Sequence, residues 1–193
     1  DWPRYRQEVY NWRVSFNVCY DGQSWLFMLA PCTGIYFDNN TIARYNGFGR
    51  SQNACARLDV RGGNPVGKPS GAHFRNNLFI YSSSPYSGNR SGGALKTANW
   101  YSKYQSPGTK YMGDSNQAGS GDPRLVDLEK QDYRLKADSP LRGQAINLSG
   151  LYKTDFNGRP LPKTGNWDIG AIQYTAAKAA KAMQPKRRPT VHR

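Results

Sequence analysis

The residue types that could do chemistry gather in one basic stretch of the chain, between positions 57 and 75. This stretch offers cations that can hold an anion, one carboxylate, and one imidazole that can accept or donate a proton near neutral pH. The candidates are Arg57, Asp59, Arg61, Lys68, His73 and Arg75. His73 is the central candidate because the chain has only two histidines, and the other, His192, lies near the C-terminus. The alternative for His73 is a structural role in a strand.

Alternating polar and apolar residues indicate that most of these candidates lie on β-strands with one buried face. Leu58 and Val60 alternate with the first three candidates, and Phe74 separates the last two. Lys68 lies in a Gly- and Pro-rich insertion between the two strands. We therefore expect the candidate side chains to project together from the outer face of neighbouring strands.

The strand that carries His73 and Arg75 belongs to a recurring unit in which alternating residues lead to an asparagine at a bend, and the strand around Arg57–Arg61 is a further strand outside this unit. The unit occurs at Asn17, at Asn39–Asn40 and at Asn76–Asn77. The intervals from Asn17 to Asn40 and from Asn40 to Asn77 are 23 and 37 residues, which suits stacked coils, the second with an insertion. Each coil would cover the inward face of its neighbour, and the asparagines would hydrogen-bond from coil to coil. Unrelated hairpin turns are the alternative.

The last third of the chain carries short apolar strand pieces separated by Asp, Gly, Pro and Ser turn residues. In chain order, its motifs are Gly121–Asp127, Asp132–Leu135, Asp138–Pro140, Thr154–Pro160 and Trp167–Ala171. In this order they resemble the closing segment of secreted right-handed parallel β-helix proteins, the pectate-lyase-like superfamily. The resemblance covers roughly residues 70 to 175. The acidic residues of these motifs stand in turn contexts, so we expect them to cap tight turns.

The resemblance implies an all-β fold, a right-handed parallel β-helix (a solenoid), of which this chain forms the C-terminal coils and a loop-rich closing segment. Residues 1–120 would be the coils with loop insertions, 121–175 the closing segment, and 176–193 a basic flexible tail. No cap is recognisable in residues 1–12, and an open end exposes backbone groups and apolar side chains. We therefore expect residues 1–20 to contact an upstream segment or another protein chain.

The resemblance also implies a secreted or extracellular protein that binds or processes carbohydrate. β-Helix polysaccharide lyases remove the proton next to a uronate carboxylate and eliminate the 4-linked sugar, which requires a cation, or calcium, and a base. On that analogy His73 and Arg75 would be catalytic. The substrate-binding residues would be Arg57, Asp59, Arg61 and Lys68.

Two other functions stay open. Glycoside hydrolysis needs a pair of carboxyl groups, and the only acids on the repeated strands are Asp38, beside the Asn pair, and Asp59. Asp38 also suits a turn, and no close pair of acids is visible, so a lyase is favoured over a hydrolase. A non-catalytic structural, adhesion or filament-forming subunit is the alternative to an enzyme, because the resemblance rests on closing motifs and not on a catalytic motif.

Composition narrows the choice of partners. The formal net charge is +14 and the isoelectric point is about 9.9, which suits an anionic polysaccharide; a basic surface that only aids solubility is the alternative. Nucleic acid is not favoured, because the chain has neither a recognition helix nor a sheet motif for base stacking. An apolar run of about 18 residues, long enough to span a membrane, is missing.

Cysteine usage is compatible with secretion but does not decide it. The chain contains Cys19, Cys32 and Cys55, without a Cys-x-x-Cys or Cys/His pair, so we expect no zinc site. In a secreted protein either Cys19–Cys32 or Cys32–Cys55 could form a disulfide.

Overall fold

The computed structural model describes residues 9–20, 25–29, 32–43, 57–60, 71–80, 95–102, 114 and 116–176. For residues 9–10, 25–29, 32–33 and 57–60 it describes the backbone and strand pairing. Of the predicted features, the basic tail beyond residue 176, the candidates Arg61 and Lys68, and the first eight residues lie outside these ranges.

The described chain is all-β, with no helix within these ranges, as predicted. The strands are β1 Val9–Tyr10, β2 Arg13–Ser15, β3 Val18–Tyr20, β4 Trp25–Leu29, β5 Cys32–Thr33, β6 Tyr36–Asp38, β7 Thr41–Ala43, β8 Arg57–Val60, β9 His73–Arg75, β10 Leu78–Ile80, β11 Leu95–Thr97, β12 Trp100–Tyr101, β13 Gly119–Ser120, β14 Leu125–Asp127 and β15 Asp132–Leu135. Every pairing between these strands is parallel except the hairpin of β14 and β15, and two isolated antiparallel bridges, Ala145 with Trp167 and Thr154 with Pro160, lie outside the strands.

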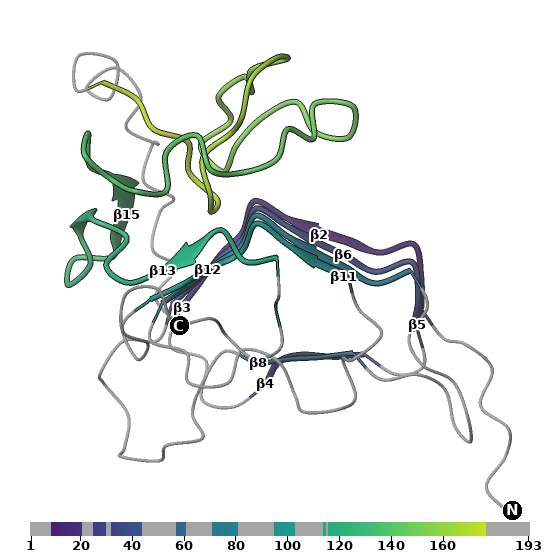
Figure 1. Ribbon diagram of the computed structural model, residues 1–193. Helices are drawn as coiled ribbons and strands as arrows, with labels where there is room; N and C mark the ends of the chain where they lie inside the picture. Colours follow the sequence, from purple (N-terminus) through teal and green to yellow (C-terminus); the bar gives the residue numbers. More distant parts are fainter. Residues whose placement is uncertain are drawn as a thin grey trace, which may run out of the picture.

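Two parallel sheets dominate the structure (Figure 1). The first sheet has the order β2-β6-β9-β11, and the second has the order β3-β7-β10-β12-β13. We call a strand of the first sheet, the bend that follows it and the next strand of the second sheet a row. Successive rows stack in the same direction with equivalent residues in register, so that Arg13, Tyr36, His73 and Leu95 form one line across the first sheet.

Asparagines at the bend connect the rows, which confirms the predicted ladder. The Nδ2 of Asn17 donates to Oδ1 of Asn40 at 3.1 Å, and the Nδ2 of Asn40 donates to Oδ1 of Asn77 at 3.0 Å. Two members were not predicted: Asn77 donates to Oδ1 of Asn99 at 3.0 Å, and Asn99 donates to Oδ2 of Asp114 at 3.0 Å. All four amides point the same way along the stack, and the ladder ends in a carboxylate.

The residue before each ladder asparagine has a left-handed backbone. The φ angles are 53° at Phe16, 53° at Asn39, 59° at Asn76 and 54° at Ala98. Asparagine tolerates this region far better than other residues with a side chain, which explains the Asn-Asn pairs in the sequence. We call these four positions the bend column.

The closing segment packs on the outer side of the second sheet, where Figure 1 draws it in green to yellow. Leu78 and Trp100 of the sheet share one core cluster with Leu141, Trp167 and Ile169 of the closing segment. Members of the bend column hold the segment in place. Asn76 exchanges two hydrogen bonds of 2.9 Å with the backbone of Ile146, and the Nδ2 of Asn39 donates to the carbonyl oxygens of Asp168 and Gly170.

Asp122, Asp127, Asp132 and Asp155 of the closing segment cap turns, as predicted, whereas the carboxylate of Asp138 pairs with Arg124. Oδ1 of Asp122 accepts from the amide of Arg124 at 2.8 Å. Oδ1 of Asp155 accepts from the amides of Asn157 and Arg159, both at 2.9 Å. These carboxylates are therefore occupied by the fold, and this leaves them little capacity for chemistry.

The inner side of the two sheets is stacked from row to row. The rings of Phe37 and Phe74 are 5.2 Å apart, and those of Phe79 and Tyr101 are 5.3 Å apart with an interplanar angle of 4°. Cys19 is a free, half-buried thiol, so the Cys19–Cys32 alternative for a disulfide is not formed. Burial raises the pKa of the Cys19 thiol, which lowers its reactivity.

The ladder makes a first testable prediction. Replacing Asn77 by Ala removes a buried amide that bonds both neighbouring rows and the carbonyl oxygen of Phe37. We expect the free energy of unfolding to fall by about 1–3 kcal/mol for the partners left unsatisfied. Urea unfolding followed by tryptophan fluorescence measures it, with the exposed Asn166→Ala as the matched control. Equal unfolding midpoints for the two variants would contradict a stabilising ladder.

Candidate functional site

The outer face of the first sheet carries two lines of side chains. Alternation along each strand turns Phe37 and Phe74 inward, where they are 1% and 0% exposed. The residues on either side of them point outward. One outer line contains Arg13, Tyr36, His73 and Leu95, and the other contains Ser15, Asp38, Arg75 and Thr97. His73 and Arg75 therefore share a face opposite Phe74, as predicted from the sequence.

Arg13, Tyr36 and His73 form a continuous stack along the first line. The guanidinium carbon of Arg13 lies 4.2 Å from the centre of the Tyr36 ring. The rings of Tyr36 and His73 are 5.1 Å apart with an interplanar angle of 5°. Both faces of the Tyr36 ring and one face of the His73 ring are in contact with these neighbours, so the ring edges and the exposed Arg13 are what a ligand can reach. This arrangement suits hydrogen bonding to an anion along the edge of the stack.

A buried ion pair anchors the second line. Asp38, whose side chain is 0% exposed, accepts from Nε of Arg75 at 2.7 Å and from Nη2 of Arg75 at 2.6 Å. Tyr152 of the closing segment donates its hydroxyl proton to the same carboxylate at 2.6 Å. The pair thus ties two neighbouring rows to the closing segment, and the charge of Arg75 is largely compensated by Asp38.

Proton affinities on this face follow from burial and from the two arginines. Burial, together with the hydrogen bond to Asp38, raises the pKa of Tyr152 to about 12, so this hydroxyl stays protonated. Burial pulls the pKa of Arg75 down, but the hydrogen bond and charge of Asp38 outweigh this and raise it overall. Burial lowers the pKa of His73, and the positive charge of Arg75 lowers it further, against the opposing effect of Asp38. His73 is therefore neutral at pH 7 and can accept a proton.

Two of the predicted site residues lie elsewhere in the sheet arrangement. Arg57 and Asp59 belong to β8, which pairs with β4 in a separate two-stranded sheet. The face that carries His73 and Arg75 is built from β2, β6, β9 and β11 instead. The assignment of Arg57, Asp59, Arg61 and Lys68 to substrate binding stays a prediction, as do the catalytic roles of His73 and Arg75.

Sequence reasoning missed Arg13, Tyr36 and Tyr152, and it favoured a turn role for Asp38. A signal for the strand residues exists, because Arg13, Tyr36 and His73 each stand four positions before a ladder asparagine. Counting back four positions from the ladder would have found them, and counting back two positions from Asn40 and Asn77 gives Asp38 and Arg75. Tyr152 has no such signal, since its partner Asp38 is 114 residues away.

The described part of the chain offers no acid pair on this face and no group of three metal-ligating residues. Asp38 is the only carboxylate in the two outer lines, and it is already bonded to Arg75 and Tyr152. Within the same ranges, no helix is long and apolar enough to cross a membrane. The arrangement can hold an anion and supply one neutral imidazole; it lacks the two carboxyl groups of glycoside hydrolysis.

Comparison with known proteins found no significant match to a protein-family model, a curated protein or a solved structure. The resemblance to parallel β-helix proteins therefore rests on the sequence motifs and on the arrangement of the strands.

The stack makes a prediction about proton binding. We expect His73 to titrate below its ordinary value of 6.5. Arg13 contributes to the lowering, so Arg13→Gln should shift the midpoint upward. The unfolded chain then binds more protons than the folded one near pH 6, so this contribution to stability is present above about pH 6.5 and is lost as the pH falls. NMR titration of the imidazole protons measures the midpoint, with Lys136→Gln as a control that should leave it unchanged. A midpoint above 6.5 in the unaltered chain would contradict the assignment.

The Tyr152 hydroxyl makes a second prediction for this face. Tyr152→Phe keeps the ring, which contacts Phe16 edge-on at 5.6 Å, but removes one donor from the buried Asp38. Hydrogen bonds to charged groups contribute about 1.5–3 kcal/mol, so the free energy of unfolding should fall by about that amount. The half-buried Tyr174→Phe is the matched control, and urea unfolding is the measurement. An effect no larger than that of the control would rule out a stabilising contact.

Proposed function

We propose that the chain is a right-handed parallel β-helix that binds acidic polysaccharide outside the cell, on the outer face of β2, β6, β9 and β11. Support for the fold comes from the rows that stack in one register, from the asparagine ladder and from the closing motifs. A stack of rows whose inner faces cover one another is the general design of solenoids.

The observation that carries the binding proposal is the Arg13–Tyr36–His73 stack. It presents an exposed cation and a neutral imidazole along the direction in which rows repeat. Rows of parallel strands lie about 4.8 Å apart, and a uronate polymer repeats its carboxylates along its own axis. An extended acidic glycan laid across the rows can therefore meet Arg13 and His73 with successive polar groups. The basic charge of the chain, +14, favours such a partner at longer range.

Lyase chemistry is the second candidate, and the lowered pKa of His73 favours it. A neutral imidazole can remove the proton next to a uronate carboxylate, after which the bond to the 4-linked sugar breaks and the leaving oxygen takes up a proton. Arg13 would stabilise the carboxylate as negative charge develops on it. Arg75, held by Asp38, would orient this part of the face. Calcium is an alternative source of positive charge for the same step.

The test is a binding assay with polygalacturonate and alginate, by isothermal titration calorimetry at low salt. Arg13→Gln and His73→Gln should each weaken binding several-fold, whereas the exposed Lys136→Gln, which removes one charge elsewhere, should not. Binding should also weaken as salt is raised, because the screening length falls from about 10 Å at 0.1 M to about 3 Å at 1 M. Dextran, a neutral glucan, should not bind.

The same mixtures separate the alternatives. Ultraviolet absorbance of an unsaturated product would establish lyase activity, and its loss in His73→Gln would assign the base. Binding without product leaves a carbohydrate-binding protein. Neither binding nor product at low salt would contradict the proposal and favour a structural or filament-forming subunit.

A further inference from the structure

The first row, β2 and β3, has a free edge among the described strands. Both strands lie at the end of their sheets. In the second row, the backbone amides of Tyr36 and Thr41 donate to the carbonyl oxygens of Trp12 and Asn17 in the first row. Arg13 and Val18 hold the equivalent positions in the first row, so their amides face the free edge. Tyr20 is 51% exposed, although Ala43 and Ile80 at the same register are 1% and 0% exposed. This row therefore presents unpaired strand groups and uncovered side chains.

The asparagine ladder is open at the same edge. The side chain of Asn17 is exposed and donates to Asn40 and to the carbonyl oxygen of Ser15. In every later row, Oδ1 of the ladder asparagine accepts from the asparagine of the row before it. The Oδ1 of Asn17 is the one ladder acceptor whose preceding row is absent from the described strands. Because the side chain is exposed, this oxygen is accessible to the donor of an incoming row.

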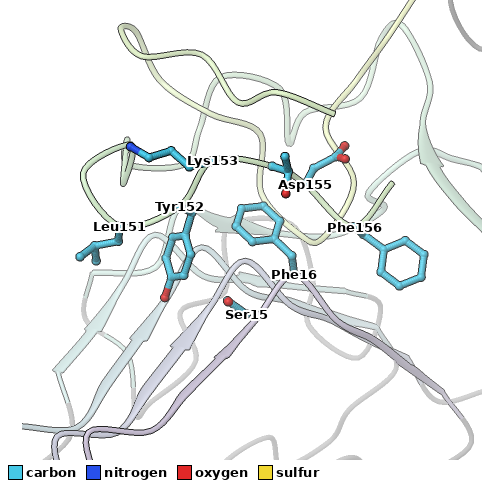
Figure 2. Close-up of a pocket in the computed structure, with 8 residues that line it drawn as sticks. Ser15, Phe16, Leu151, Tyr152, Lys153, Asp155 and Phe156 are labelled. Atoms are coloured by element: carbon cyan, nitrogen blue, oxygen red, sulfur yellow. The ribbon is translucent and has the colours of Figure 1, made fainter. Parts of the chain in front are cut away.

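A pocket of about 370 Å³ extends the bend column past Phe16 (Figure 2). Ser15 and Phe16 of the first row line it on one side, and residues 151–156 of the closing segment line it on the other. Figure 2 shows Leu151 and Phe156 at its two ends, with Tyr152 and Phe16 between them. Leu151 and Phe156 are 46% and 51% exposed. The closing segment contacts successive members of the bend column, first Asn76, then Asn39, then Phe16. In one further row, the residue equivalent to Phe16 would therefore lie at the pocket.

We infer that this edge and the pocket beside Phe16 bind a polypeptide segment that adds one further row in parallel register and carries asparagine at the ladder position. Its backbone pairs with β2 and β3, its bend residue enters the pocket, and its asparagine amide donates to Oδ1 of Asn17. This is strand addition, in which main-chain bonds supply affinity and a side-chain pocket supplies specificity.

A second copy of this chain fits the edge less well than such a segment. Two copies joined edge to edge by a two-fold axis would align their β2 strands antiparallel, whereas the ladder bond requires parallel register. Stacking head to tail would bring the opposite end of the ladder to Asn17, and that end is Asp114. Asp114 acts there as an acceptor, from Asn99 and from the Tyr101 hydroxyl, and it lacks the amide N–H groups with which an asparagine would donate to Oδ1 of Asn17.

The test uses the full chain and a fluorescein-labelled peptide with the sequence of Gly71–Ile80, which is one row of this protein with its own ladder asparagine. Fluorescence anisotropy should show saturable binding. The same peptide with Asn77→Ala should bind about tenfold more weakly, the effect of one lost hydrogen bond. In the protein, Leu151→Glu should reduce binding, whereas Val126→Glu, at a position with 40% exposure on β14, should not.

Each other outcome counts against the inference. Equal binding of the two peptides would show that the ladder position is not recognised, and a lack of saturable binding would overturn the docking surface itself. Sedimentation velocity of the chain alone tests whether a second copy of the chain occupies this surface. A dimer abolished by Leu151→Glu would assign the surface to a second copy and overturn the choice of occupant.

Discussion

Asparagine at the bend is the constraint on which the rest of the structure depends. A buried bend leaves backbone and side-chain polar groups without strand partners, and each unsatisfied group costs about 1–3 kcal/mol. The amides of Asn40, Asn77 and Asn99, at most 2% exposed, satisfy these groups from one row to the next. Because each amide bonds the ladder residue of the next row and a backbone carbonyl of the preceding row, the ladder also sets the register of both sheets. That register is what brings Arg13, Tyr36 and His73 into one line.

The Asn-Asn pairs combine two tasks that a single residue could not perform. The first member takes the left-handed backbone and turns its amide toward the closing segment, and the second builds the ladder. Phe16 and Ala98 are the two exceptions in the bend column, and Phe16, a bulky residue with φ of 53°, carries strain on the order of 1–3 kcal/mol. Its ring contacts Tyr152 and Trp167 at 5.6 and 6.1 Å, and this packing offsets the strain. The closing segment therefore stabilises the bends that position the outer face.

Repetition explains which features the sequence could predict. Alternation and the Asn-Asn pairs are local patterns, so the all-β class, the ladder at Asn17, Asn40 and Asn77, and the shared face of His73 and Arg75 could all be derived from them. The far end of the ladder could not, because Asn99 follows an alanine and Asp114 is not an asparagine. Tyr152 was also out of reach, since its contact with Asp38 depends on how a distant segment docks on the sheet.

Arg75 and Arg13 have different roles on the outer face, because Arg75 is paired with the buried Asp38 and Arg13 is exposed. Arg75 binds the buried Asp38 through Nε and Nη2, a bidentate pair along one edge of its guanidinium, and is thus unsuited to exchange its partner for a ligand. It still contributes a positive charge close to His73, which favours the neutral imidazole. Arg13 is exposed; it packs on the ring of Tyr36 and its side chain is hydrogen-bonded to the Tyr152 hydroxyl, without a carboxylate partner among the described contacts, so it can turn toward an anion. Under the proposed function, such a face would bind an anion through Arg13, whereas the protonation of His73 responds to both Arg75 and Arg13, so the two properties are coupled.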